Sequence, residues 1–128
     1  MGKKAYLYQA HALQRWISRK RMQIEKLRAV AEKTTASVSE TPKSPSGGTD
    51  RMEAAICDIA VLEDEIHQME MQLDEIRERI ETVQDPLLQD LLVYRYLQYL
   101  PWNEVAACLG YSERQTHRLH QKALEKMK

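Results

Sequence analysis

One long stretch of the chain carries apolar residues at steps of three and four without a break. The ten positions are Met52, Ala55, Ile59, Leu62, Ile66, Met69, Leu73, Ile76, Ile80 and Val83. Such a seam is typical of a coiled-coil helix, because its spacing keeps one narrow face turned toward a partner. A helix with so narrow an apolar face is marginal in water when isolated. The stretch therefore predicts a long helix that needs a second helix beside it.

The N-terminal part of the chain offers a matching helix. Residues 4–33 contain neither Pro nor Gly, and their apolar positions repeat at similar steps, with Lys20 as the one polar exception. These positions are Tyr6, Ala10, Leu13, Ile17, Ile24, Leu27 and Ala31. At ~1.5 Å per residue, this helix and one over 51–84 would each span roughly 45 to 50 Å. The similar lengths predict a pair, folded back within one chain or formed between two chains.

Charge separates the two predicted helices. Residues 1–33 carry nine Lys and Arg against two Glu, whereas residues 51–86 carry three Arg against eleven Asp and Glu. A basic helix alone would suggest nucleic-acid binding. The acidic helix favours a different interpretation, in which the Lys and Arg side chains flank the seam and set orientation and register. Partial exposure of Arg19, Lys20 and Arg21 still allows nonspecific phosphate contacts.

Composition divides the chain into an arm and a terminal domain. Residues 34–50 are dominated by Ser, Thr, Pro and Gly, and they cannot bury enough apolar surface to offset their ordering entropy, so a flexible linker is expected. The arm covers residues 1–84 and the domain residues 85–128. Strong helix formers abound, which predicts an all-α fold. We expect a coiled-coil hairpin, or an intermolecular coiled coil, followed by a three-helix domain.

The terminal domain begins with a strongly apolar helix. Asp85 and Pro86 are residue types favoured at the N-cap and the first position of a helix. The helix that follows carries Leu, Val and Tyr up to about Leu100 and needs cover on more than one side. Two further short helices are expected to supply that cover.

The two short helices are joined by a turn. The first starts after Pro101 and is expected to bury Val105, Ala106 and Leu109. Gly110 falls at its end, where a left-handed conformation is often needed. Ser112 is placed as the N-cap of the last helix, residues 112–126. Two short helices joined by a turn with glycine indicate a helix-turn-helix.

The last helix has an apolar and a polar side. The inner side is predicted to hold Thr116, Leu119, Ala123 and Met127. The outer side carries donors that suit DNA, because Arg forks onto guanine, Gln onto adenine, and Lys suits phosphate. Since the N-terminal residues of a recognition helix reach the bases, we predict base contacts for Glu113, Arg114, Gln115, His117 and Arg118. Backbone contacts are predicted for Gln121 and Lys122. Ser112, at the start of the helix, completes the predicted set of DNA-binding residues.

The run from Leu97 to Leu124 contains a specific pattern that starts at Trp102, namely Trp-x-Glu-Val-Ala-x-x-Leu-Gly-Tyr-Ser-x-Arg-Gln-x-x-Arg-Leu-His-x-x-Ala-Leu. It resembles region 4 of bacterial sigma-70 factors, and Leu92-Val-Tyr-Arg-Tyr-Leu97 resembles the helix that precedes the motif there. More closely, the chain is similar to phage-encoded late-transcription regulators of the RinA/ArpU type. The resemblance implies that Ser112 begins the recognition helix and that Glu113, Arg114, His117, Arg118 and Gln121 face DNA. The sequence departs from region 4 at Thr116, where Val or Ile is usual, and at Glu113, where a basic residue is common.

Together these features predict a sequence-specific, DNA-binding transcriptional regulator of phage type. Its expected partner is double-stranded DNA, with bacterial RNA polymerase as a candidate second partner and a homodimer through the coiled coil as a candidate assembly. Two alternatives remain open. One is a DNA-packaging protein like a small terminase subunit, although such subunits usually place the DNA-binding part first. The other is a coiled-coil adaptor whose terminal domain docks a protein.

The sequence lacks the signals of enzymes, metal-binding proteins and membrane proteins. No nucleophile is paired with a base and no phosphate loop occurs, so neither enzymatic activity nor a cofactor is expected. His117 and His120 have the spacing of half a metal site, but no neighbouring Cys or carboxylate pair completes it, so no metal is expected. No apolar run approaches the ~20 residues that a bilayer requires. We therefore expect no membrane association. The expected location is the cytoplasm of a bacterial host cell, and there the thiols of Cys57 and Cys108 are expected to be reduced and half-buried.

Overall fold

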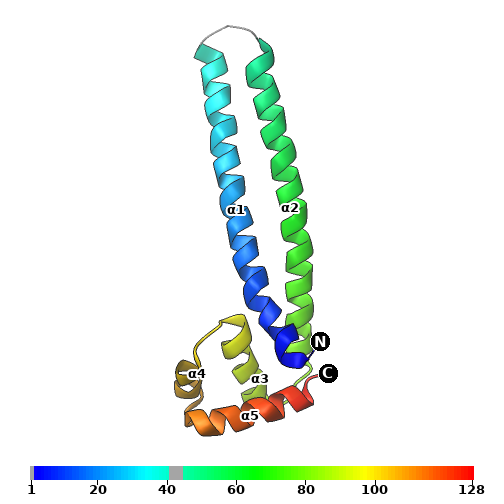
Figure 1. Cartoon of the computed structure of the whole chain (residues 1–128), viewed down its shortest axis with the longest axis vertical. Helices are drawn as coiled ribbons and strands as arrows, with labels where there is room; N and C mark the ends of the chain where they lie inside the picture. Colours follow the sequence, from blue (N-terminus) through cyan, green and yellow to red (C-terminus); the bar gives the residue numbers. More distant parts are fainter. Residues whose placement is uncertain (1, 41–44) are drawn as a thin grey trace. The chain divides into compact units, whose positions relative to one another are not determined.

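The computed structural model describes residues 2–40 and 45–128, with side chains for 2–33 and 50–128, and this part of the chain is all-helical. In chain order the elements are α1 (Lys3–Glu40), α2 (Pro45–Glu81), α3 (Pro86–Leu92), the π-helix η1 (Val93–Leu97), α4 (Trp102–Leu109) and α5 (Glu113–Lys126) (Figure 1). The predicted all-α class is confirmed. The bounds of α1 and α2 extend into the predicted linker at 34–50, whose centre, 41–44, lies outside the described residues.

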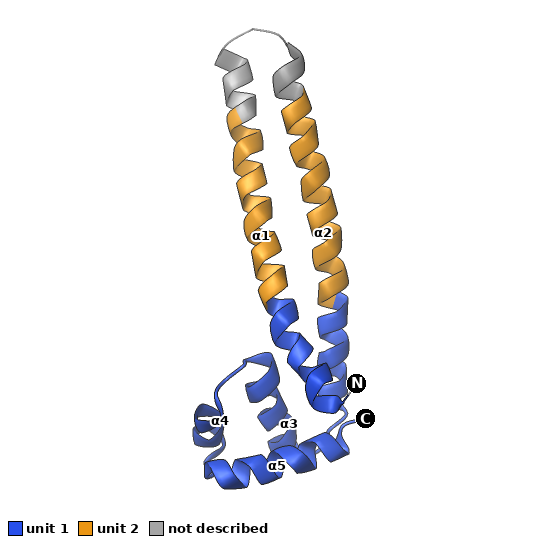
Figure 2. Cartoon of the chain, in the orientation of Figure 1, with its two compact units in different colours: residues 1–14, 71–128 blue, residues 15–70 orange. Residues whose placement is uncertain are grey.

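The chain forms two compact units (Figure 2). Unit 1 consists of residues 1–14 and 71–128, and unit 2 of residues 15–70. Helices α1 and α2 each contribute to both units. The boundary expected between residues 84 and 85 lies inside unit 1, in the short connection between α2 and α3.

Unit 2 is built from neighbouring parts of α1 and α2. The predicted seam positions there are buried or half-buried: Ile17, Ile24, Leu27 and Ala31 on α1, and Ala55, Ile59, Leu62, Ile66 and Met69 on α2. Met52, the first predicted position of the α2 seam, is exposed instead. The heptad spacing thus identifies the covered side of each helix over most of its length in this unit.

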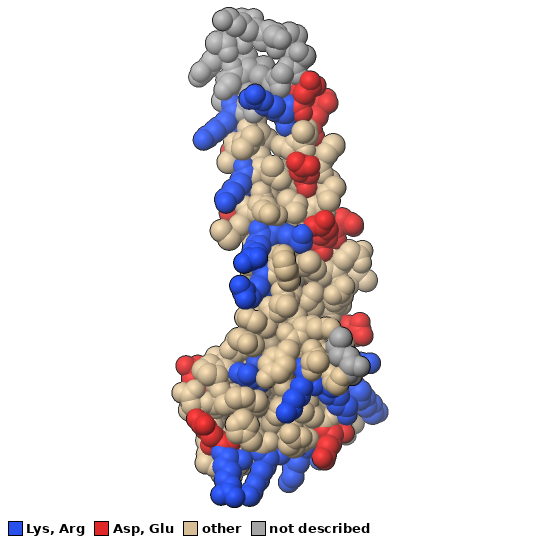
Figure 3. Space-filling model, in the orientation of Figure 1, with Lys and Arg blue, Asp and Glu red and all other residues tan. Residues whose placement is uncertain are grey.

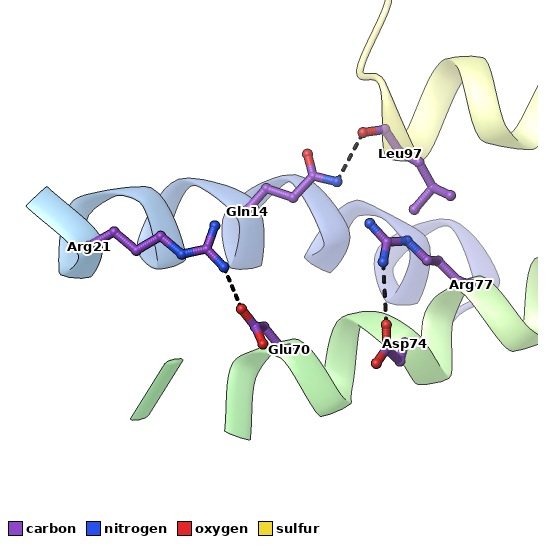
Figure 4. Close-up of polar contacts among 6 residues, drawn as sticks. All are labelled: Gln14, Arg21, Glu70, Asp74, Arg77 and Leu97. Carbon is purple, nitrogen blue, oxygen red and sulfur yellow. Dashed lines mark hydrogen bonds and ion pairs between the residues drawn. The ribbon is translucent and has the colours of Figure 1, made fainter. Parts of the chain in front are cut away.

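Ion pairs link the basic side of α1 to the acidic side of α2 within unit 2. They join Lys20 to Glu65, Arg21 to Glu70 and Arg28 to Glu63. Arg21 Nη2 lies 2.5 Å from Glu70 Oε1 (Figure 4), and Figure 3 shows the Lys and Arg side chains on α1 beside the Asp and Glu side chains on α2. Exposed pairs contribute about 0–1 kcal/mol each. The three pairs join the basic helix to the acidic helix, as the charge separation in the sequence predicts.

Unit 1 has a core to which both long helices and the shorter ones contribute. Its largest fully buried side chains are Leu7 of α1, Ile76 and Ile80 of α2, Val83, and Leu91, Leu92, Tyr96, Val105 and Thr116 in the C-terminal part. Helix α5 packs against α3 and α4. The first turns of α1 therefore belong to the same unit as the helices predicted to bind DNA.

Helix α3 starts as predicted but its continuation is irregular. The Asp85 carboxylate accepts a hydrogen bond from the Leu87 amide at 3.0 Å, with Pro86 at the first helical position. The π-helix η1 follows directly, and Tyr99 just beyond it has a φ of 55°. This conformation costs a residue with a side chain about 1–2 kcal/mol. The Tyr99 ring stacks on His11, with 3.6 Å between ring centroids, and this contact helps offset the cost.

Candidate nucleic-acid interface

A well-defined turn joins α4 to α5. Gly110 follows α4 with a φ of 77° and a ψ of 29°, the left-handed conformation predicted there. Side-chain-bearing residues are strained at this φ, whereas glycine is not. The Gly110 and Tyr111 amides both donate to the Ala106 carbonyl, at 2.9 and 3.1 Å. These bonds fix the direction in which the chain enters α5.

Ser112 caps α5, as predicted. Its Oγ accepts a hydrogen bond from the Gln115 amide at 3.2 Å, and the Gln115 Oε1 accepts one from the Ser112 amide at 3.4 Å. This reciprocal pair is a capping box, which satisfies backbone donors that the first turn leaves without partners. The structure thus gives Gln115 a capping role that sequence reasoning did not assign to it.

The buried side of α5 differs in part from the prediction. Thr116, Ala123 and Met127 are buried as expected, but Leu119 is only half-buried, while His120 and Leu124 are 3% and 7% exposed. Thr116 fits a buried position because its Oγ1 donates to the Ser112 carbonyl at 2.8 Å. In the preceding helix, Val105 and Ala106 are buried as predicted and Leu109 is half-buried.

His120 is a core residue. Its Nε2 lies 2.7 Å from Tyr96 Oη, and its ring meets Trp102 edge-on with centroids 4.7 Å apart. Burial is the largest cause that lowers its pKa to about 4, and electrostatic interactions with Lys4, His117 and Arg95 add to the shift. The imidazole is therefore neutral near pH 7. Its spacing, four residues after Thr116 and three before Ala123, is the signal that could have placed it on the inner side.

The outer side of α5 gathers the predicted DNA-contacting residues. The exposed side chains there are Glu113, Arg114, His117, Arg118, Gln121 and Lys122, with Ser112 and Gln115 exposed at the start of the helix. Figure 3 shows Lys and Arg side chains along the outer edge of α5, with acidic side chains beside them. All eight residues predicted from the sequence thus lie on the solvent-facing part of one capped helix.

A pocket of about 480 Å³ opens along this face, within unit 1. From α5 it is lined by Arg114, His117, Arg118, His120 and Gln121, and the other lining side chains are Lys4, Tyr8 and Trp102. Its volume lies within the range of about 300–1,000 Å³ seen for ligand pockets. Sequence reasoning missed Lys4, because it assigned the basic side chains of α1 to the acidic partner helix. It also missed Tyr8, because no motif links this residue to α5.

Arg95 contacts two of the residues that line this pocket, Tyr8 and Trp102. Its Nη1 donates to the Leu100 carbonyl at 2.9 Å, and its Nη2 donates to Tyr8 Oη at 3.1 Å. The guanidinium carbon also lies 4.9 Å from the centroid of the Trp102 ring, a cation–π distance. One side chain therefore ties η1 to α1 and to the start of α4. The signal in the sequence was a lone cation in a strongly apolar helix.

The start of α1 is anchored to the end of α5. Lys3 Nζ donates to the Leu124 and Met127 carbonyls at 2.6 and 2.8 Å. A cation is favourable there, because the last carbonyls of a helix lack intrahelical donors and carry the negative end of its dipole. Further along α1, Gln14 Nε2 donates to the Leu97 carbonyl at 3.0 Å (Figure 4). These bonds hold the first turns of α1 beside the pocket.

No protein-family model, curated protein or solved structure matches the chain. The resemblance to sigma region 4 therefore stays a prediction from the sequence pattern between Trp102 and Leu124. Within the described ranges no group of three or more His, Cys, Asp or Glu side chains could hold a metal ion, and no helix combines the length and apolar character that crossing a bilayer requires.

The two cysteines differ from expectation. Cys57 and Cys108 are free and both are exposed, whereas half-buried thiols were expected. Each follows a buried alanine, Ala55 or Ala106, by two residues. Two residues correspond to roughly 200° around a helix, which directs each thiol away from the covered side.

Proposed function

We propose that this protein is a sequence-specific DNA-binding regulator in which α4 and α5 form a helix-turn-helix. The observation that carries the proposal is the outer side of α5, where Arg114, Arg118 and Gln121 are exposed together. The other side of the helix packs on α3 and α4, and its start is fixed by Ser112. Rigid placement and exposed donors at the N-terminal end are what a helix needs to read the major groove.

The proposed contacts follow from side-chain chemistry. Arg114 and Arg118 lie one turn apart on the same side of α5, so both guanidinium groups can enter one groove and fork onto guanine. Glu113, an unusual residue for region 4, can accept a hydrogen bond from the cytosine amino group. Gln121 and Lys122 lie further along the helix and are assigned to the sugar–phosphate backbone.

The proposed class is a sigma-region-4-like regulator of phage type. The motif from Trp102 to Leu124 supports it, together with the preceding helix formed by α3 and η1. For unit 2 we propose a coiled-coil pairing of α1 and α2, supported by the covered seam positions and the three ion pairs. Bacterial RNA polymerase is the proposed second partner, because region 4 of sigma factors works together with that enzyme. The proposal involves no catalysis.

Arg118→Ala is expected to weaken binding to duplex DNA. Losing a bidentate contact costs about 1–3 kcal/mol, or roughly 5- to 150-fold in Kd. Fluorescence anisotropy of the full chain with labelled duplex DNA, repeated at several salt concentrations, measures the change. The wild-type affinity should fall steeply with salt, because Lys and Arg displace counterions from the phosphates.

Arg77→Ala is the matched control for this variant. Arg77 is an exposed arginine on α2 that pairs with Asp74 of the same helix at 3.3 Å (Figure 4). Its replacement should leave DNA affinity unchanged. Equal affinities for the Arg118 and Arg77 variants would remove α5 from the DNA interface. A wild-type chain that binds no duplex at low salt would contradict DNA binding altogether and favour a protein-docking adaptor.

A further inference from the structure

The pocket beside α5 is strongly cationic. Arg114 and Arg118 from α5 and Lys4 from α1 line it, and no carboxylate is among the described side chains that do so. Gln121 adds a neutral amide donor. Guanidinium, ammonium and amide groups together are the donors that proteins direct at phosphate oxygens. The lining therefore suits an anionic, oxygen-rich group.

The aromatic residues of the pocket already have side-chain partners. The Trp102 ring is contacted by Arg95 at 4.9 Å, by His117 at 4.5 Å and by His120 at 4.7 Å. Tyr8 meets the Tyr96 ring at 5.0 Å between centroids. The cationic groups are therefore the feature of the lining on which the choice of ligand rests, and they suit a phosphate group.

The position of Lys4 is fixed by its neighbours along α1. Lys3, one residue earlier, donates to the last carbonyls of α5, and Tyr8, one turn later, accepts a hydrogen bond from Arg95. The charge of Lys4 also acts on His120, another residue that lines the pocket, since it is one of the causes that lower the pKa of His120. The lysine thus stands at the pocket as part of unit 1 and not as part of the ion-paired seam of unit 2.

We infer that this pocket is a phosphate site of the DNA interface, in which Lys4 of α1 contacts a backbone phosphate next to Arg114 and Arg118. The inference rests on the proposed function, because it needs α5 to lie in the major groove. Phosphates border that groove on both sides, and an element that flanks a recognition helix meets them. Lys4 occupies such a flank. The N-terminal helix then takes part in DNA binding through its first turns, while its later cations pair with α2.

Lys4→Gln in the full chain tests the inference. Loss of one phosphate contact should weaken binding to all duplex sequences about equally, and should reduce the slope of log K against log salt concentration by about one. Lys26→Gln is the matched control, since Lys26 is an exposed lysine on the same helix that does not line the pocket. Circular dichroism melting curves of both variants should match the wild type, because Lys4 and Lys26 are both exposed.

The outcomes separate this inference from the proposed function. A Lys4→Gln chain with the wild-type affinity and salt slope, while Arg118→Ala loses affinity, would overturn the phosphate site and leave DNA binding intact. A wild-type chain that binds no duplex would overturn both. If Lys26→Gln lost as much DNA affinity as Lys4→Gln, the loss would be due to overall charge. That result would overturn the assignment of Lys4 to a phosphate site in the pocket.

A second experiment distinguishes a phosphate of the DNA backbone from a free phosphate compound. Inorganic phosphate replaces chloride at constant ionic strength, and the amide resonances of His117 and Arg118 are followed by NMR. A backbone site predicts large shifts with duplex DNA and small, non-saturating shifts with inorganic phosphate. Saturable shifts with inorganic phosphate that disappear in Lys4→Gln, without shifts from DNA, would overturn the backbone assignment in favour of a small phosphate ligand.

Discussion

Tyr96→Ala is expected to lower the free energy of unfolding by about 3–5 kcal/mol, the usual cost of truncating a buried aromatic side chain. Tyr96 is the largest of the fully buried side chains. Its ring packs edge-on against Tyr8, with 5.0 Å between centroids, and its Oη lies 2.7 Å from His120 Nε2. Alanine would leave a cavity and also deprive His120 of its hydrogen-bond partner. Urea unfolding followed by circular dichroism measures the loss.

One further variant isolates the contribution of the Tyr96 hydroxyl to stability, and another serves as a control. Tyr96→Phe keeps the ring and removes only the hydroxyl, so a loss of about 1–3 kcal/mol is expected from the unsatisfied imidazole. Tyr111→Ala is the control, because Tyr111 is 42% exposed and should cost less than about 1 kcal/mol. A Tyr96→Ala chain as stable as the Tyr111→Ala chain would contradict the described core of unit 1.

The stability of the protein is expected to fall as the pH drops from 7 toward 4. The His120 pKa is 6.5 in the unfolded chain and about 4 in the folded protein. Between these values the unfolded chain binds a proton that the folded protein does not, so acid favours unfolding. The total loss is about 3 kcal/mol, of which about 2 kcal/mol falls between pH 7 and pH 5, above the usual carboxylate range. Urea unfolding at a series of pH values measures it.

His120→Gln and His67→Gln test whether His120 is the group responsible. His120→Gln keeps a polar side chain facing Tyr96 and removes the titration, so its stability should change little between pH 7 and pH 5. His67 is exposed on α2 and is not among the groups that act on His120, so the His67→Gln chain should keep the wild-type slope. The assignment would be wrong if His120→Gln kept the full pH dependence.

Local signals in the sequence predicted local structure well. Asp85, Gly110 and Ser112 stand where the structure places two N-caps and a left-handed C-cap, because each acts on its own turn of backbone. The helical period of the last helix predicted its exposed side for the same reason. The seam positions predicted which side of each long helix is covered.

Tertiary contacts could not be predicted in the same way. Leu7 is fully buried although it lies beside the seam, because in unit 1 several helices cover α1 and its buried stripe becomes wider. Burial of His120 depends on Tyr96, which is distant in sequence and supplies its hydrogen bond. Lys4 and Tyr8 line the same pocket as α5 because the first turns of α1 contact the end of that helix. No spacing rule connects residues so far apart in the chain.

Selection from a random-sequence duplex library tests most directly whether α5 reads bases in DNA. The full wild-type chain should enrich one short motif, and the Arg118→Ala chain should lose preference at one position of that motif while keeping the rest. Retained sequences indistinguishable from the input library, or the same complete motif with Arg118→Ala, would contradict the assignment of α5 as a recognition helix.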